Sequence, residues 1–189
     1  MIAKSGSQPC RQQGVHISIM KIHIVLSILF TVLVQSASAQ AQITNRLIDY
    51  STYLNDAQRV KSIRESHRLT EGGFMKVMSE PGVVLLDARS ASKFALRHLK
   101  GAVNLSLPDF TATELSKIIP SKDTKILIYC NNNFSGSPAS FPSKAAGASL
   151  NISTFVTLTT YGYTNIFELG PLIDVKTSKL PFAGNEAGK

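Results

Sequence analysis

Cysteine is scarce in this 189-residue chain, and the two copies lie far apart, at Cys10 and Cys130. A disulfide framework is therefore excluded as the main source of stability. The four histidines are scattered as well. Because a zinc site needs three or four ligands, this supply of cysteine and histidine predicts no metal site.

Runs of like charge are also absent. The chain holds 20 Lys and Arg against 12 Asp and Glu, but the basic residues are spread along it and are not interleaved with aromatic residues. A nucleic-acid-binding surface needs basic residues that cluster, so we expect no nucleic-acid partner. The mild positive excess favours small anionic substrates without identifying one.

The first forty residues differ from the rest. Lys21 follows Met20, an apolar run extends from Ile24 to Val34, and Ala37-Ser38-Ala39 precedes Gln40. This layout is typical of a secretory signal peptide. The alternative, a membrane anchor or buried helix, fits less well because the run is short for a span and ends in small residues.

We therefore assign residues 1–39 to a leader and signal peptide, with translation starting at either Met1 or Met20. The protein is expected to be exported, to the periplasm or outside the cell, with no stable membrane span after cleavage. The mature chain would keep 17 Lys and Arg against 12 acids, a net charge of +5, and Cys130 as its one cysteine. A lone thiol is either a buried apolar residue or a reactive group.

The rest of the chain alternates between helical and strand patterns. Residues 40–67 form a lead-in segment with a helix, and residues 68–69 a short edge strand. Thr70 and Thr111 are candidate helix N-caps. Strands are predicted at 83–86, 102–105, 125–129 and 165–169, and a tail at 183–189 is predicted to be disordered.

The segment after residue 148 is ambiguous, because its β-branched residues favour a strand and its apolar spacing favours a helix. Following the spacing, we predict a helix that begins near Ser149, with Gly162 as its C-terminal cap. The alternation predicts an α/β fold with a parallel sheet of about five strands flanked by helices. Chemistry in such sheets lies at the carboxyl ends of strands, where Asp87 and Cys130 are expected.

Three segments carry a resemblance to a known family. The segment VVLLDARSASKFALRHLKGAVNLSL contains an Asp-x-Arg pair and a His-Leu-x-Gly-Ala-x-Asn motif at Asp87, Arg89, His98, Leu99, Gly101, Ala102 and Asn104. The strand ILIYC then ends in Cys130, and Gly162-Tyr163-Thr164-Asn165-Ile166 follows. In this order and spacing, residues 68–182 resemble the rhodanese-like (thiosulfate sulfurtransferase) domain, as a single-domain member.

The resemblance implies that Cys130 is the nucleophile. In this family the cysteine takes the outer sulfur of a donor such as thiosulfate, becomes a persulfide, and passes the sulfur to a thiol or cyanide-like acceptor. Only the thiolate is nucleophilic, and a helix N-terminus with converging amides stabilises it. The resemblance implies no metal or organic cofactor, and a protein partner stays open.

The loop after Cys130 departs from the family pattern. It is about ten residues longer than usual, has no arginine, and holds Lys144 as its only cation. We expect an ordered lid over the thiol that includes Phe134, Pro138, Phe141 and Pro142. Candidate substrate contacts are Asn131, Asn132, Asn133, Phe134, Ser135, Gly136 and, from the preceding helix, Lys93. Asp87, Arg89 and His98 are expected to support the site without touching substrate.

Two other functions fit parts of the sequence. The long loop and single thiol also suit a non-catalytic module that binds a ligand or partner, or senses oxidants. A rhodanese-fold phosphatase requires an arginine six residues after the cysteine, where this chain has Gly136. Without an arginine to stabilise phosphoryl oxygens, phosphatase activity is disfavoured.

Overall fold

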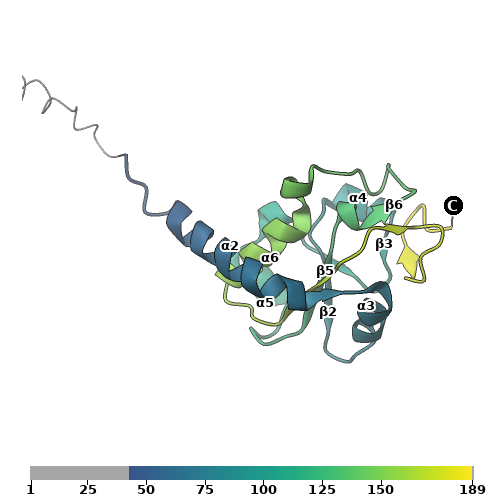
Figure 1. The fold of residues 1–189 in the computed structure, drawn as a ribbon, viewed down its shortest axis with the longest axis horizontal. Coiled ribbons are helices and arrows are strands. Elements are labelled where there is room, and N and C mark those ends of the chain that lie inside the picture. Colours follow the sequence, from purple (N-terminus) through teal and green to yellow (C-terminus); the bar gives the residue numbers. More distant parts are fainter. Residues whose placement is uncertain (1–42, 189) are drawn as a thin grey trace, which may run out of the picture. The chain divides into compact units, whose positions relative to one another are not determined.

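The computed structural model describes residues 43–188, and the predicted leader and signal peptide at 1–39 lie outside this range (Figure 1). From Leu47 onward the chain forms one compact unit. Between residues 43 and 188, no helix combines the length and apolar character that crossing a membrane requires.

Five parallel strands form the central sheet, as predicted. Their order is β1 (Arg68–Leu69), β7 (Ile166–Leu169), β5 (Ile126–Tyr129), β2 (Val84–Asp87) and β4 (Val103–Asn104). β5 is buried along its whole length because strands pair at both of its edges and a hydrophobic core covers each of its faces. Its unbroken apolar sequence is what a strand covered on both faces requires.

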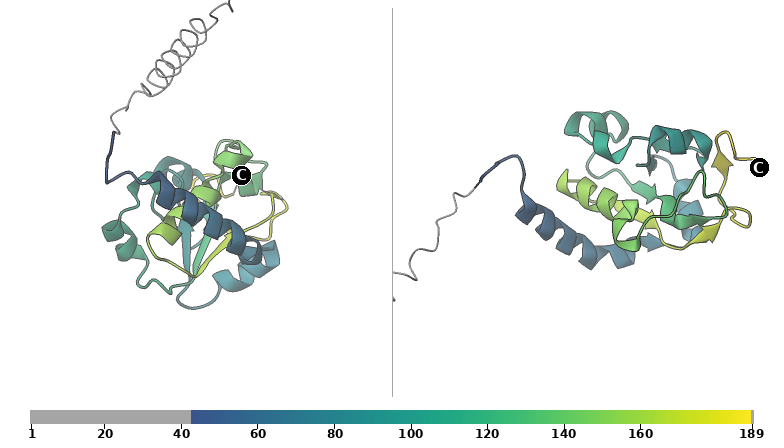
Figure 2. Two further views of the ribbon diagram at one scale, coloured as in Figure 1. Left: turned by 60° about the vertical axis from the view of Figure 1, so that its left-hand side comes forward. Right: turned by 90° about the horizontal axis from the view of Figure 1, so that it is seen from above.

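Side chains alternate between two cores along β5. Ile126 and Ile128 pack in the core under α2 (Tyr50–Arg64), α5 (Ala112–Ile118) and α6 (Leu150–Thr160). Leu127 and Tyr129 pack in the opposite core, under α3 (Glu71–Met78). α2 and α6 run side by side on their face of the sheet (Figure 2).

The helix ends follow the predicted capping pattern. The side chains of Thr70 and Thr111 accept hydrogen bonds from Gly73 N–H and Glu114 N–H. α6 ends where Gly162 takes a positive φ of 86° and donates its N–H to Thr159 O at 2.9 Å. Glycine suits this position because a left-handed backbone is strained for residues with a Cβ.

The helical assignment of α6 is confirmed despite its β-branched residues. Phe155, Val156 and Leu158 are buried against the sheet. Packing of this apolar face therefore outweighs the modest helix propensity of valine and threonine.

Shorter elements surround the sheet. α4 (Ala91–Leu96) follows β2, and 3₁₀ turns occupy Glu65–His67, Leu107–Asp109, Asn131–Asn133 and Ala146–Ala148. Two small pairs complete the fold: β3 (His98–Leu99) with β9 (Phe182–Ala183), and β6 (Phe134–Ser135) with β8 (Ile173–Asp174).

The prediction of a disordered tail is wrong for residues 183–188. Ala183 pairs with His98, and the N–H groups of Asn185 and Glu186 donate to Ala95 O and Leu96 O. The tail is ordered because it pairs with β3 and the adjoining Phe182 packs against Phe134, with ring centroids 5.3 Å apart.

Candidate functional site

The site lies at the carboxyl ends of the two central strands. β2 ends in Asp87, which is level with Tyr129 at the end of β5, and Cys130 follows directly. Since both strands run in the same direction, residues separated by more than forty positions meet at one edge of the sheet.

Cys130 is almost completely covered, with 1% of its surface exposed. Its Sγ lies 3.4 Å from the hydroxyl of Ser149, the N-cap residue of α6. The positive end of the α6 dipole therefore lies beside the sulfur, where it stabilises negative charge. The hydroxyl adds a donor at the same place.

Ser149 is a functional candidate that the sequence analysis missed. It appeared there only as the approximate start of a helix. The position of Ser149 just before that helix could have identified it, because the resemblance to the family implies a helix N-terminus beside the cysteine.

Asn133 fixes the backbone around Cys130. Its Oδ1 accepts from Cys130 N–H at 2.9 Å and from Asn151 Nδ2 at 3.1 Å, and its own Nδ2 donates to Leu169 O at 2.7 Å. The side chain thus connects the end of β5, the start of α6 and the end of β7. All four hydrogen bonds of the Asn133 side chain go to other residues of the chain, so its role is to position the backbone of Cys130.

The two other asparagines play different parts. Asn132 closes the loop, because its Nδ2 donates to Lys144 O and its Oδ1 accepts from Lys144 N–H, both at 2.9 Å. Asn131 is 5% exposed, and its Oδ1 has no hydrogen-bond partner within residues 43–188.

Phe134, Ser135 and Gly136 anchor the loop to the core opposite to α6 and to β8. Phe134 packs on Phe141 and Tyr129, with centroids 4.6 and 6.0 Å apart, in the core opposite to α6. Ser135 pairs with Asp174 of β8. Gly136 has a φ of 80°, and a Cβ there would lie 2.5 Å from Asp174 Oδ1. The loop is ordered, but its aromatic residues fill a core instead of covering the thiol.

Asp87 and Arg89 form a buried ion pair. Arg89 Nη2 lies 2.6 Å from Asp87 Oδ2, and Arg89 Nη1 donates to Ser140 O at 2.9 Å. The Tyr129 hydroxyl donates to Asp87 Oδ2 at 2.6 Å. Burial raises the pKa of Tyr129 well above its ordinary value of 10.0, and the Asp87 carboxylate adds to the rise. These contacts join β2, β5 and the long loop. The Asp87–Arg89 pair therefore supports the structure of the site.

Lys93 and His98 occupy different surroundings. Lys93 extends from α4 to donate to Ala139 O in the loop at 2.8 Å. His98 Nδ1 contacts Phe94 O at 2.7 Å, and its ring stacks on Phe94 with centroids 3.7 Å apart. His98 therefore supports the turn after α4, whereas Lys93 faces the cavity described next.

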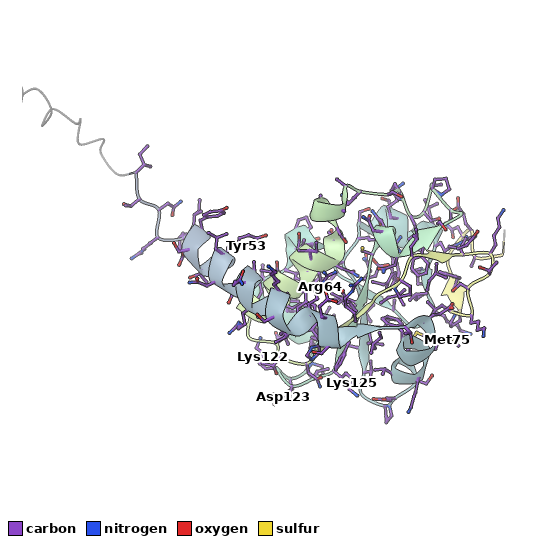
Figure 3. All side chains as sticks on the ribbon, viewed as in Figure 1. Tyr53, Arg64, Met75, Lys122, Asp123 and Lys125 are labelled. Atoms are coloured by element: carbon purple, nitrogen blue, oxygen red, sulfur yellow. The ribbon has the colours of Figure 1, made fainter. Side chains whose placement is uncertain are left out.

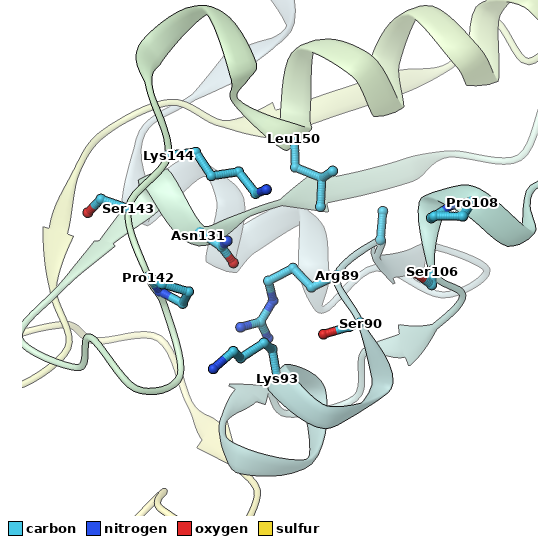
Figure 4. A pocket seen from close by; sticks show the side chains of 11 residues that line it. Arg89, Ser90, Lys93, Ser106, Pro108, Asn131, Pro142, Ser143, Lys144 and Leu150 are labelled. Atoms are coloured by element: carbon cyan, nitrogen blue, oxygen red, sulfur yellow. The ribbon is translucent and has the colours of Figure 1, made fainter.

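A cavity of about 500 Å³ opens beside the thiol (Figure 4). Its walls carry three cationic and no acidic side chains, and the lining residues are Ala88, Arg89, Ser90, Lys93, Ser106, Pro108, Asn131, Pro142, Ser143, Lys144 and Leu150. Cys130 is not among them. Its neighbour Asn131 and the neighbour of Ser149, Leu150, both are, so the cavity reaches the residues that adjoin Cys130 and Ser149 in the chain.

No group of three or more His, Cys, Asp or Glu side chains suited to a metal ion occurs among residues 43–188.

Several solved structures are similar to this chain at low identity. The BH2092 protein from Bacillus halodurans is 17% identical over 72% of this chain and 90% of its own, with a TM-score of 0.49. An E. coli rhodanese with anions is 20% identical over 55% and 99%, with a TM-score of 0.38. Thiosulfate sulfurtransferase from Pseudomonas aeruginosa is 13% identical over 64% and 21%, with a TM-score of 0.42.

No curated protein matches the chain. The family model of the rhodanese-like domain, however, matches residues 71–169. Because this match spans more than half of the 189 residues, the chain belongs to the rhodanese-like domain family.

Proposed function

We propose that the protein is a sulfurtransferase that carries sulfane sulfur on Cys130. The thiolate attacks the outer sulfur of thiosulfate, a bond forms between Sγ and that sulfur, and sulfite leaves with the electron pair of the broken S–S bond. An acceptor such as cyanide then attacks the outer sulfur of the persulfide and regenerates the thiolate. No cofactor takes part in either step.

The observation that carries the proposal is the position of Sγ at the N-terminus of α6, 3.4 Å from the Ser149 hydroxyl. A helix N-terminus stabilises the thiolate and the persulfide anion alike. The cationic cavity next to it supports entry of an anionic donor, since Lys93 and Lys144 bring positive charge without a neighbouring carboxylate in the lining.

The covered thiol adds a requirement. With 1% of Cys130 exposed, a donor reaches Sγ only when the residues that cover it move aside. Transfer therefore includes a movement of the loop between residues 131 and 149, as lid motions do in other enzymes.

Mass spectrometry of the reduced mature protein tests the proposal. Treatment with thiosulfate should add the mass of one sulfur atom, and cyanide should remove it with release of thiocyanate. Cys130→Ser should gain nothing. Failure of the wild-type chain to gain sulfur from any sulfane donor would reject the proposal.

A second candidate is a non-catalytic binding or redox-sensing module, because the nearly complete cover over Cys130 hinders its attack on an external sulfur donor. Such a module would take up no sulfur from a sulfane donor, yet Cys130 would oxidise and recover reversibly with peroxide and a thiol reductant. The two functions are separated by the same mass measurement.

We also propose that the protein is exported and that its mature form begins at Gln40. The layout of residues 20–39 supports this. N-terminal sequencing of the protein recovered from its native cell tests it, and a mature chain that starts at Met1 or Met20 would contradict export by cleavage.

A further inference from the structure

Helix α2 has two apolar faces, and the fold covers only one of them. Ala57, Val60 and Ile63 pack in or against the core beneath the helix. Tyr50 and Leu54 recur with Ala57 at intervals of four and three residues, the spacing that places side chains along one face of a helix. Within residues 43–188 this second face is largely open to solvent, because Tyr50 is 70% exposed and Leu54 is 48% exposed.

The first turns of α2 extend past the end of α6. The hydroxyl of Thr160, the last residue of α6, donates to Asp56 Oδ2 at 2.7 Å, so the residues of α2 before Asp56 lie beyond that helix (Figure 2). Tyr53, which is labelled in Figure 3, is therefore 45% exposed. Its ring stacks on that of Tyr50, with centroids 6.2 Å apart.

These side chains form one exposed apolar patch. Ile48, just before the helix, is 74% exposed, and with Tyr50, Tyr53 and Leu54 it makes up what we call the α2 patch. Exposed apolar groups that adjoin one another mark interaction surfaces. Tyrosine is also enriched where the binding energy of an interface is concentrated.

The same side of α2 has a hollow beside the patch. Its volume is about 220 Å³, its apolar walls include Ala57, Ile152 and Val156, and Lys61 and Glu65 contribute charge. Pockets that hold small molecules have volumes upward of roughly 300 Å³. The hollow therefore suits a protruding side chain better than a ligand.

A protrusion and a hollow on one surface are what a twofold contact between identical chains requires, because each copy then supplies both parts. The charges are complementary in the same sense. Asp49 caps the start of α2 and Lys61 lies in its last turn. Neither forms an ion pair with another residue between 43 and 188. Two antiparallel α2 helices bring the acidic start of one beside the basic end of the other.

A membrane surface suits the patch less well. Helices that bind anionic lipids carry lysine and arginine beside their apolar face. Residues 47–58, which include the patch, contain two aspartates and no lysine or arginine.

We propose that the α2 patch is the interface of a homodimer, in which two α2 helices pack antiparallel about a twofold axis near Leu54. Tyr50 of each copy fills the hollow beside Ala57 of the other copy. Asp49 lies beside Lys61 of the other copy, because these two residues are equally far along the chain from Asn55. None of the patch residues lines the cavity beside Cys130, so the inference does not depend on sulfur transfer.

Sedimentation of the proposed mature chain, over about a hundredfold range of concentration, tests the dimer. Wild type should show a reversible monomer–dimer equilibrium. Leu54→Asp should raise the dissociation constant at least tenfold, because it places a charge in an apolar contact. Leu172→Asp is the matched control, since Leu172 is 68% exposed and lies outside α2, and it should leave the constant unchanged. Circular dichroism checks that both variants are folded.

Disulfide formation tests the geometry without a disruptive charge. In a Cys130→Ser background, Leu54→Cys places a thiol near the axis and should give a covalent dimer on mild oxidation. Arg59→Cys places it about 140° further around the helix, and should give little.

Three outcomes would overturn the proposal. The first is a wild-type chain that stays monomeric over the whole range, including one that uses the patch to bind vesicles of anionic phospholipid. The second is a dimer that Leu54→Asp and Leu172→Asp affect equally, which would place the interface elsewhere. The third is equal cross-linking through Leu54→Cys and Arg59→Cys.

Discussion

Ser149 and Asn133 approach Cys130 in different ways. The serine hydroxyl contacts the sulfur, whereas the asparagine holds the cysteine backbone through its N–H. The Asp87–Arg89 pair is a third kind of contact, because it is buried under Tyr129 and Phe141 and joins segments without reaching Cys130. Substitutions at these positions should therefore affect different measurements.

Ser149→Ala should slow persulfide formation from thiosulfate about tenfold, because a hydrogen bond to a charged group contributes about 1.5–3 kcal/mol and the 3.4 Å contact favours the lower end. The Ser149 side chain caps no backbone group of α6, so the helix should stay intact. Stopped mixing with mass detection measures the rate.

Ser149→Thr keeps the hydroxyl and should retain most of the rate. Ser116→Ala, on α5 and outside the cavity lining, is the matched control and should leave the rate unchanged. Equal rates for wild type and Ser149→Ala would show that the hydroxyl does not act on the sulfur.

Arg89→Met should destabilise the protein by about 3–5 kcal/mol, because it leaves the Asp87 carboxylate buried without its partner. Urea unfolding measures this. Arg59→Met removes an ion pair with Asp56 whose arginine is 60% exposed, and should change stability by less than about 1 kcal/mol. Similar values for both variants would contradict the supporting role of Arg89.

At the scale of elements, the loop between β5 and α6 is held by other parts of the fold. Phe134 is fixed by β6 and the aromatic core, Ser140 O accepts from Arg89, and the Ser140 hydroxyl donates to Glu186 in the tail at 2.6 Å. The half nearer to α6 is held by the paired bonds between Asn132 and Lys144. This half covers the thiol, so it is the part that must move.

Asn132→Ala should speed alkylation of Cys130 by about 5- to 160-fold. The variant removes two hydrogen bonds, each contributing about 0.5–1.5 kcal/mol, and so populates the open loop. Timed reaction with iodoacetamide measures the rate. Asn165→Ala removes one bond to Asp123 O at the opposite end of β5 and should have no effect. An unchanged rate in Asn132→Ala would mean that these bonds do not limit access.

At the scale of the whole molecule, a buried carboxylate joins α2 to the sheet. Glu168 on β7 is fully buried and lies 2.8 Å from Arg64 Nη2 at the end of α2, a residue labelled in Figure 3, and 3.2 Å from Arg68 Nε. Burial raises the pKa of Glu168 above its ordinary value of 4.5, although both arginines oppose the rise. Helix α2 is therefore attached through a group whose charge depends on pH.

This pKa shift predicts a direction for stability. Because the folded protein holds the Glu168 proton more tightly than the unfolded chain, stability is lost as pH rises from 4.5 through the raised pKa. The Glu168→Gln variant has no titratable group at this position, so its stability lacks this dependence on pH. Urea unfolding at several pH values from 4.5 to 7.5 should show the variant gaining stability relative to wild type as pH rises. If the variant instead loses stability relative to wild type as pH rises, Arg64 and Arg68 lower the pKa of Glu168 by more than burial raises it.

Local sequence patterns were enough to predict the main elements. The parallel strands follow from short apolar runs, and the helix starts follow from threonine caps at Thr70 and Thr111. The helix from Leu150 to Thr160 follows from the spacing of its apolar residues. Cys130 and Asp87 at one sheet edge follow from strand direction. Each of these features depends on residues a few positions apart or on one rule of α/β folds.

Other features depend on contacts between segments far apart in the chain, which no local pattern contains. The tail is ordered by pairing with residues near 95–98, and the opposite-core position of Phe134 and Phe141 depends on Tyr129. The shielding of Cys130 and its contact with Ser149 depend on how a long loop closes over the sheet. Loop closure balances chain entropy against a few specific hydrogen bonds. The closed form of the loop is therefore known only from the folded molecule, whereas the position of Cys130 at the end of its strand can be predicted from the order of residues alone.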